Sequence, residues 1–200
     1  HAQKAVTLDR NDSECQETLG WILLHRRSYD AAEEAYGRAL ELNPNSPDEL
    51  SAMGAVCNFL GRPEEGLEWL QRAKQRDPHF DPTWYWHILG VTCFNARRYD
   101  EAIASFGRSP SLPAWAQAYL AASHAKGGQA ERARELSAKL LATAPEFSGA
   151  GLLAKEPYRQ PADQLHLLEG LRKAGLLPAD ATLPGAARPA IAVLPFANIS

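Results

Sequence analysis

The chain has 200 residues, of which 45% are apolar and 22% charged, a composition typical of an ordered protein in water. The 24 acidic residues slightly outnumber the 21 Lys and Arg residues, so the formal net charge is −3. This balance provides no basic surface for nucleic acid or for an acidic membrane, and we expect neither as a partner. No apolar run approaches the ~18 residues of a membrane-spanning helix.

Cysteine usage favours a reducing compartment. Cys15, Cys57 and Cys93 form no CxxC pair, and any pairing leaves one thiol over. We therefore expect a cytoplasmic location. The chain opens at His1 without a methionine, a charged leader or an apolar leader segment, and we expect it to be an internal piece of a longer protein.

A repeat of 34 residues organises the chain. Ala5, Ala39 and Ala73 follow one another at this spacing, and Leu19-Gly20 recurs at the same step as Met53-Gly54. Within each unit, apolar and small residues fall at helical spacing in two successive runs. Each unit is therefore predicted to be a helical hairpin, in which small residues allow close packing and Pro44 or Pro78 ends the second helix.

Four full units are predicted after the end of a truncated upstream repeat at 1–12. They span residues 13–147, divided roughly as 13–46, 47–82, 83–113 and 114–147. The third unit is irregular, because its second helix is expected to stop early at Ser109-Pro110.

The repeat period is lost after Phe147, and a different organisation is expected there. Residues 148–176 are predicted to form C-terminal capping helices, the main one running from Pro161 to Gly175. The Pro, Ala and Gly content of 177–189 is typical of a linker. Residues 190–200 then begin with AIAVLPF and are predicted to be the first strand of a truncated second domain.

The order small residue, Tyr or Phe, small residue, then Pro resembles the tetratricopeptide repeat, whose usual length matches this period. The resemblance implies an all-α fold, a right-handed α-solenoid of helical hairpins with a C-terminal capping helix. We expect an extended array in which each hairpin contacts only its neighbours.

A more specific resemblance lies in the segment from Ala154 to Leu176, AKEPYRQPADQLHLLEGLRKAGL. It resembles the end of the repeat region in bacterial signalling proteins that join such repeats to a class III adenylate cyclase or a winged-helix domain. Residues 188–200 resemble the opening strand of a TolB-like domain, which usually precedes the repeats in those proteins and here follows them.

The concave face of such a solenoid is lined by the first helix of each hairpin, and exposed aromatic residues there mark a candidate peptide groove. Asp48 would add negative charge to its rim. The Lys and Asn pattern by which some tetratricopeptide domains hold a terminal carboxylate is absent. The predicted groove residues are Glu14, Glu17, Trp21, Phe59, Trp84, His87, Phe94 and Trp115.

No catalytic, cofactor or metal site is predicted. The GxGxxG-like run at 149–154 lacks the preceding strand that a dinucleotide site requires. Cys57, Cys93 and His124 occupy equivalent positions on separate helices, too far apart for one zinc ion. We therefore expect a non-enzymatic interaction module that binds a peptide, a partner protein or its own effector domain. The alternative is the regulatory arm of a nucleotide cyclase or a winged-helix transcriptional regulator.

Overall fold

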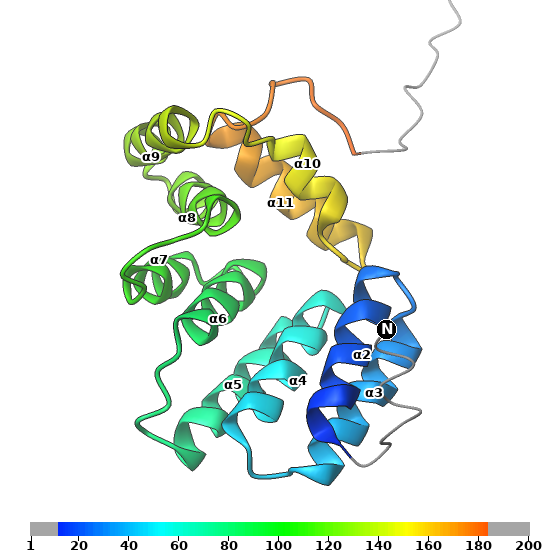
Figure 1. Ribbon diagram of the computed structural model, residues 1–200. Coiled ribbons are helices and arrows are strands. Elements are labelled where there is room, and N and C mark those ends of the chain that lie inside the picture. Colours follow the sequence, from blue (N-terminus) through cyan, green and yellow to red (C-terminus); the bar gives the residue numbers. More distant parts are fainter. Residues whose placement is uncertain (1–11, 184–200) are drawn as a thin grey trace, which may run out of the picture.

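A computed structural model describes residues 12–183, in which ten α-helices and no strand are found (Figure 1). No helix in this range is both long and apolar enough to cross a membrane. The expected all-α solenoid of helical hairpins is confirmed. Residues 1–11 of the predicted upstream repeat end (1–12) and the whole predicted strand at 190–200 lie outside the described residues.

Four hairpins are followed by two single helices. The hairpins pair α2 with α3, α4 with α5, α6 with α7, and α8 with α9, while α10 and α11 follow as a C-terminal unit (Figure 1). The helices are α2 (Ser13–His25), α3 (Tyr29–Leu42), α4 (Pro47–Phe59), α5 (Pro63–Arg76), α6 (Thr83–Asn95), α7 (Tyr99–Gly107), α8 (Ala114–Lys126), α9 (Ala130–Thr143), α10 (Gly149–Lys155) and α11 (Pro161–Lys173).

Local sequence signals set where several helices begin. Asp12 caps α2 by accepting a hydrogen bond from the Cys15 amide, and Ser46 caps α4 through the Asp48 and Glu49 amides. Proline occupies the first turn of α4, α5 and α11, where its missing N–H costs nothing. Helix α7 has only 9 residues, which accounts for the irregular third unit.

The turn inside each hairpin has the same geometry four times. Arg27, Gly61, Arg97 and Gly128 all have positive φ, between 60° and 87°, and the second helix starts two residues later. Glycine adopts this conformation without steric cost, whereas arginine does so only where other contacts compensate. The two arginines therefore indicate turns that make contacts beyond their own hairpin.

Small residues bring the helices of each hairpin into direct contact. A Cβ added to Gly20 would lie 2.7 Å from the Tyr36 ring, and one added to Gly90 would lie 2.7 Å from the Phe106 ring. In the second hairpin the contact is between backbones, because a Cβ at Gly66 would lie 2.7 Å from the Gly54 carbonyl oxygen. These pairs explain why the repeat alternates small and large residues.

The C-terminal unit closes the array back onto its first hairpin. Helix α11 packs against α8 and α6, and the segment between α10 and α11 reaches the turn between α2 and α3. There the Tyr29 hydroxyl donates to the Tyr158 carbonyl at 2.8 Å, and Arg159 pairs with Asp30 at 2.9 Å. The expectation of an extended array with contacts only between neighbours is therefore wrong, because residues 154–163, named here the closing segment, join its two ends.

Tyr158 is the buried centre of this closure. Its hydroxyl donates to Asn95 Oδ1 at 3.1 Å and lies 2.8 Å from the Tyr119 hydroxyl. Asn95 in turn donates to Asn58 Oδ1 at 2.8 Å, and the Tyr158 ring lies 5.3 Å from that of Phe59. One side chain thus connects α4, α6 and α8, and its hydrogen-bonding network of Tyr119, Asn95 and Asn58 is buried.

Packing continues beyond the last helix. Leu177, Ala181 and Leu183 lie partly buried against the C-terminal core, and Gly149 of α10 leaves room for the Leu176 carbonyl. Three of the first seven residues of the expected linker, 177–183, therefore pack against the helices, and the other four are exposed. Gly149 also begins a helix that follows α9, so the glycine-rich run has a packing role and is not preceded by a strand.

Replacing Gly66 with alanine should lower the free energy of unfolding by about 1–3 kcal/mol, because the new methyl group meets backbone that cannot move easily. Gly37→Ala is the matched control: Gly37 lies inside α3 with nothing within 4 Å of an added Cβ. This control should stabilise the protein by about 0.5–1 kcal/mol. Urea unfolding measures both, and equal effects would contradict the packing described here.

Tyr158→Phe should destabilise the protein by about 1–3 kcal/mol, because it removes the donor that satisfies the buried Asn95 oxygen. Tyr29→Phe also removes one hydrogen bond of the closure, but at a partly exposed site, and should cost less. Urea unfolding of the two variants makes the comparison. An unchanged Tyr158→Phe midpoint would show that the closure does not depend on this network.

Candidate functional site

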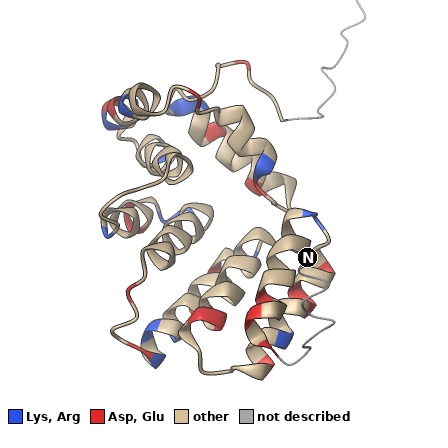
Figure 2. Cartoon of the chain, viewed as in Figure 1, with Lys and Arg blue, Asp and Glu red and all other residues tan. Residues whose placement is uncertain are grey.

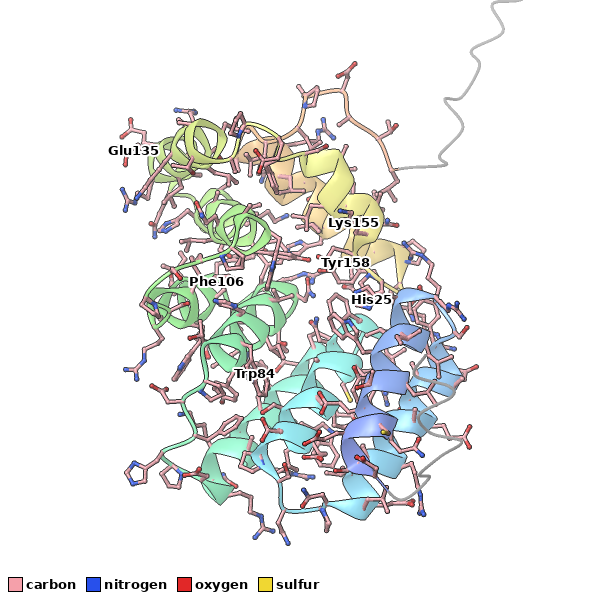
Figure 3. The ribbon with its side chains drawn as sticks, viewed as in Figure 1. His25, Trp84, Phe106, Glu135, Lys155 and Tyr158 are labelled. Atoms are coloured by element: carbon pink, nitrogen blue, oxygen red, sulfur yellow. The ribbon has the colours of Figure 1, made fainter. Side chains whose placement is uncertain are left out.

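The closure encloses a cavity of about 650 Å³, named here the chamber. The first helices of the four hairpins form one wall, with α10 and the loop before it on the other side. Figure 3 labels three of the lining residues, Trp84 on α6, His25 on α2 and Lys155 on α10. The chamber is therefore built from residues far apart in the sequence.

Three tryptophans from three hairpins line the chamber. Trp21 on α2 is 49% exposed, and Trp84 on α6 and Trp115 on α8 are each 38% exposed. Large apolar side chains that remain exposed in one concave site are typical of binding surfaces. Phe59 and His87, two further predicted groove residues, line the same chamber.

Phe94 does not belong to the site, and its prediction as a groove residue is wrong. Its side chain is fully buried, with its ring 5.5 Å from that of Tyr119 and 4.7 Å from that of His166. The physical reason is that α11 packs on this side of α6 and covers the ring. Gly170 of α11 allows this close approach.

The aromatic wall is held by edge contacts and one hydrogen bond. The rings of His87 and Trp115 meet edge to face at 5.6 Å, and Trp84 meets Phe80 in the same way at 5.6 Å. His87 Nε2 lies 2.9 Å from the Ser109 hydroxyl, and burial lowers the pKa of His87 below its usual value. His87 is therefore neutral near pH 7.

The opposite wall was not predicted from the sequence. Ser148 caps α10 by accepting a hydrogen bond from the Gly151 amide at 3.0 Å, and Leu152 faces the chamber from this helix. Arg27 holds the other end of α10 by donating to the carbonyls of Ala154 and Glu156. Cationic groups at a helix C-terminus are favourable because the last carbonyls carry partial negative charge.

Glu156 places a desolvated carboxyl group in the chamber wall. Burial raises the pKa of this carboxyl to about 7, although its hydrogen bond with Tyr119 acts in the opposite direction. Tyr158 donates its proton to Asn95, so Tyr119 must donate either to Tyr158 or to Glu156. A protonated Glu156 satisfies both tyrosines at once, in agreement with the raised pKa.

An acidic site adjoins the chamber. Glu14 and Glu17 of α2 and Asp48 and Glu49 of α4 line a second cavity, and Trp21 borders both. Figure 2 shows Asp and Glu on these two helices. Burial, and then repulsion from the three neighbouring carboxylates, raises the pKa of Glu17 to about 7. Of the eight predicted groove residues, five therefore line the chamber, two line this acidic site and one is buried.

Parts of the chain are similar in sequence to known proteins. Residues 25–109 match the family model for anaphase-promoting complex, cyclosome, subunit 3. The chain is 36% identical over 80 residues to small glutamine-rich tetratricopeptide repeat-containing protein 2 of Mycosarcoma maydis, covering 40% of this chain and 22% of that protein. It is 27% identical over 149 residues to cellulose synthase 2 operon protein C of Komagataeibacter xylinus, covering 66% of this chain and 11% of that protein.

A solved structure has the same fold. The crystal structure of YrrB, described as a TPR protein with an unusual peptide-binding site, superimposes with a TM-score of 0.55 at 18% identity, covering 90% of this chain and 93% of YrrB. The chain therefore has the fold of a tetratricopeptide-repeat protein. It spans less than a quarter of the length of the curated relatives named above.

Glu156→Gln should raise the melting temperature at pH 8 by several degrees and leave it unchanged at pH 4. The folded protein holds this proton up to about pH 7, whereas an unfolded glutamate loses it near its ordinary pKa of 4.5, so stability falls as the pH rises between these values. Thermal melts at the two pH values test this.

Glu169→Gln is a control in which the pKa of the replaced carboxyl is shifted in the opposite direction. Its hydrogen bond with Lys126 lowers the pKa of Glu169, so its contribution to stability is present at neutral pH and is lost in acid. This variant should melt slightly lower than the wild type at pH 8. A Glu156→Gln variant that behaves in the same way would show that Glu156 is a stabilising, ionised group.

Proposed function

We propose that the chain is a non-enzymatic protein-interaction module whose chamber binds a peptide segment of a partner protein. The observation that carries this proposal is the set of three exposed tryptophans, one each from the first, third and fourth hairpins, around one cavity. At about 650 Å³ the chamber lies within the ~300–1,000 Å³ range usual for ligand sites.

The shape and chemistry of the site fit an extended peptide. The chamber opens beside the acidic site across Trp21, so a chain of several residues can contact both at once. The aromatic rings provide apolar contact area at low entropic cost, as they do in many protein interfaces. The likeness to YrrB, described as having a peptide-binding site, adds support from the same fold.

The doubly substituted variant Trp84→Glu with Trp115→Glu should lose at least tenfold in affinity for peptides selected by the wild-type chain from a phage-displayed random library. Two charges in the chamber would prevent the rings from covering an apolar ligand. The matched control is Leu141→Glu with Leu165→Glu, because these leucines are 42% and 45% exposed and lie outside the chamber. Isothermal titration calorimetry with synthetic peptides measures the affinities.

The control should bind like the wild type, and circular dichroism should show that both variants remain helical. Failure to select any peptide would contradict the proposal. Equal losses in the two variants would place the binding site elsewhere on the molecule.

A second candidate is the regulatory arm of a bacterial nucleotide cyclase or winged-helix regulator. The stretch that resembles those proteins, residues 154–176, includes the closing segment and α11, which hold the array in its closed form. An effector domain attached nearby could therefore be coupled to the state of the chamber. The full coding sequence tests this candidate: a cyclase would carry paired metal-binding aspartates, and a winged-helix protein a basic recognition helix.

A further inference from the structure

We propose that the chamber selects a positively charged side chain, the guanidinium of Arg or the ammonium of Lys, which lies against the tryptophan rings and pairs with the Glu156 carboxylate. The inference rests on the proposed function, since the cation belongs to the bound peptide. It adds the feature by which the site distinguishes one peptide from another.

The aromatic wall provides the first part of such a site. Trp21, Trp84 and Trp115 are three of the five tryptophans in the chain, and all three line this one cavity. The face of an indole ring carries negative charge density and attracts cations more strongly than the rings of Tyr or Phe. Such attraction becomes stronger as the cation loses water, and a side chain bound in the chamber would lose part of its hydration.

Glu156 provides the second part. Its desolvated carboxyl has Tyr119 as a hydrogen-bond partner, and no Lys or Arg of residues 12–183 forms an ion pair with it. The nearby Arg27 guanidinium is directed to backbone carbonyls of the closing segment, including that of Glu156. A desolvated carboxylate without a counterion is costly, and a ligand cation would remove that cost.

The adjoining acidic site provides the third part. In the described residues, Glu14, Glu17, Asp48 and Glu49 form no ion pair with Lys or Arg. Their field attracts basic peptides and raises the rate of encounter, and it disfavours acidic ones. Because Trp21 borders both cavities, a basic peptide that approaches the acidic site lies next to the chamber.

Other ligand types fit less well. An anionic side chain would face Glu156 and Glu146 in the chamber and the four carboxylates beside it, which together outnumber the one lysine of the lining, Lys155. An apolar side chain would contact the tryptophans but would provide no counterion for Glu156. A cation on an aliphatic stem matches both walls, since the stem contacts the rings while the charged end reaches the carboxylate.

Binding a cation should also release a proton. The Tyr119 and Tyr158 hydroxyls and the Arg27 guanidinium lie next to Glu156, and the side chain of the adjacent Lys155 is exposed. The Arg97–Asp163 pair lies in the same region beside Tyr158. The other titratable groups of the chamber wall are His25, His87 and Glu146. Burial lowers the pKa of His87 and raises that of Glu156, so the two pKa values move in opposite directions. A ligand cation favours the ionised carboxylate, so affinity should rise as the pH rises from 6 to 8.

The test uses each selected peptide in two forms, one with its Arg and Lys residues and one in which citrulline replaces Arg and Nε-acetyl-lysine replaces Lys. These neutral forms keep the length and most of the shape. The full chain should bind the charged form at least tenfold more tightly at pH 8, and this preference should shrink at pH 6. Isothermal titration calorimetry at the two pH values gives the affinities and, in two buffers, the protons released.

Glu156→Gln should remove the preference for the charged form while keeping the shape of the side chain and a hydrogen-bond partner for Tyr119. Glu34→Gln is the matched control, because Glu34 is exposed on α3, lines neither the chamber nor the acidic site and should have little effect. Equal binding of the charged and neutral forms would overturn the inference and leave the proposed function intact. A preference that survives Glu156→Gln would overturn it as well.

A small probe separates the two proposals if no peptide is selected. L-Argininamide is titrated against the full chain while the tryptophan fluorescence is recorded, with citrullinamide as the neutral control. Saturable quenching by argininamide that Glu156→Gln abolishes would support the cation site, although the peptide-binding function had failed. No difference between the two probes would overturn the cation site too.

Discussion

The docking of the closing segment onto the hairpin turns is the constraint on which the rest of the molecule depends. Each hairpin alone has an apolar face that only its neighbours cover, and such stacking leaves the two ends of the array free. Here Arg27, Tyr29 and Asp30 of the first turn bind residues 154–159, and Arg97 of the third turn pairs with Asp163. These contacts set the curvature and place α10 opposite the first helices.

The same closure creates the chamber and gives it its charge. Glu156 lies in the segment that docks, and the burial of that segment under Tyr119 and Tyr158 desolvates its carboxyl. The stability of the closure and the chemistry of the chamber are therefore coupled, because protonation of Glu156 favours the hydrogen-bond network that a ligand cation would rearrange. A peptide bound in the chamber and the closing segment would therefore affect the hydrogen bonds of the same two tyrosines, Tyr119 and Tyr158.

The repeat and its packing could be predicted from the sequence because their signals are local. The 34-residue spacing, Gly20 against Tyr36 and the proline-started helices depend on residues within one or two hairpins. The closure could not be predicted in this way, since Tyr29 and Tyr158 are 129 residues apart and obey no period. For the same reason Phe94 was misassigned: α6 is apolar nearly all round, and only the position of α11 decides which of its aromatic residues are covered.

The residue types at the four hairpin turns are nevertheless related to the closure. All four need a positive φ, which glycine adopts freely and an L-residue adopts at a cost of about 1–2 kcal/mol. Gly61 has Gln160 of the closing segment directly against it, so no side chain fits there, and Gly128 lies away from that segment with open space around it. Only Arg27 and Arg97 depart from glycine, and both extend to the closing segment. The long-range contacts of Arg27 and Arg97 with the closing segment therefore offset part of the cost of their backbone conformation.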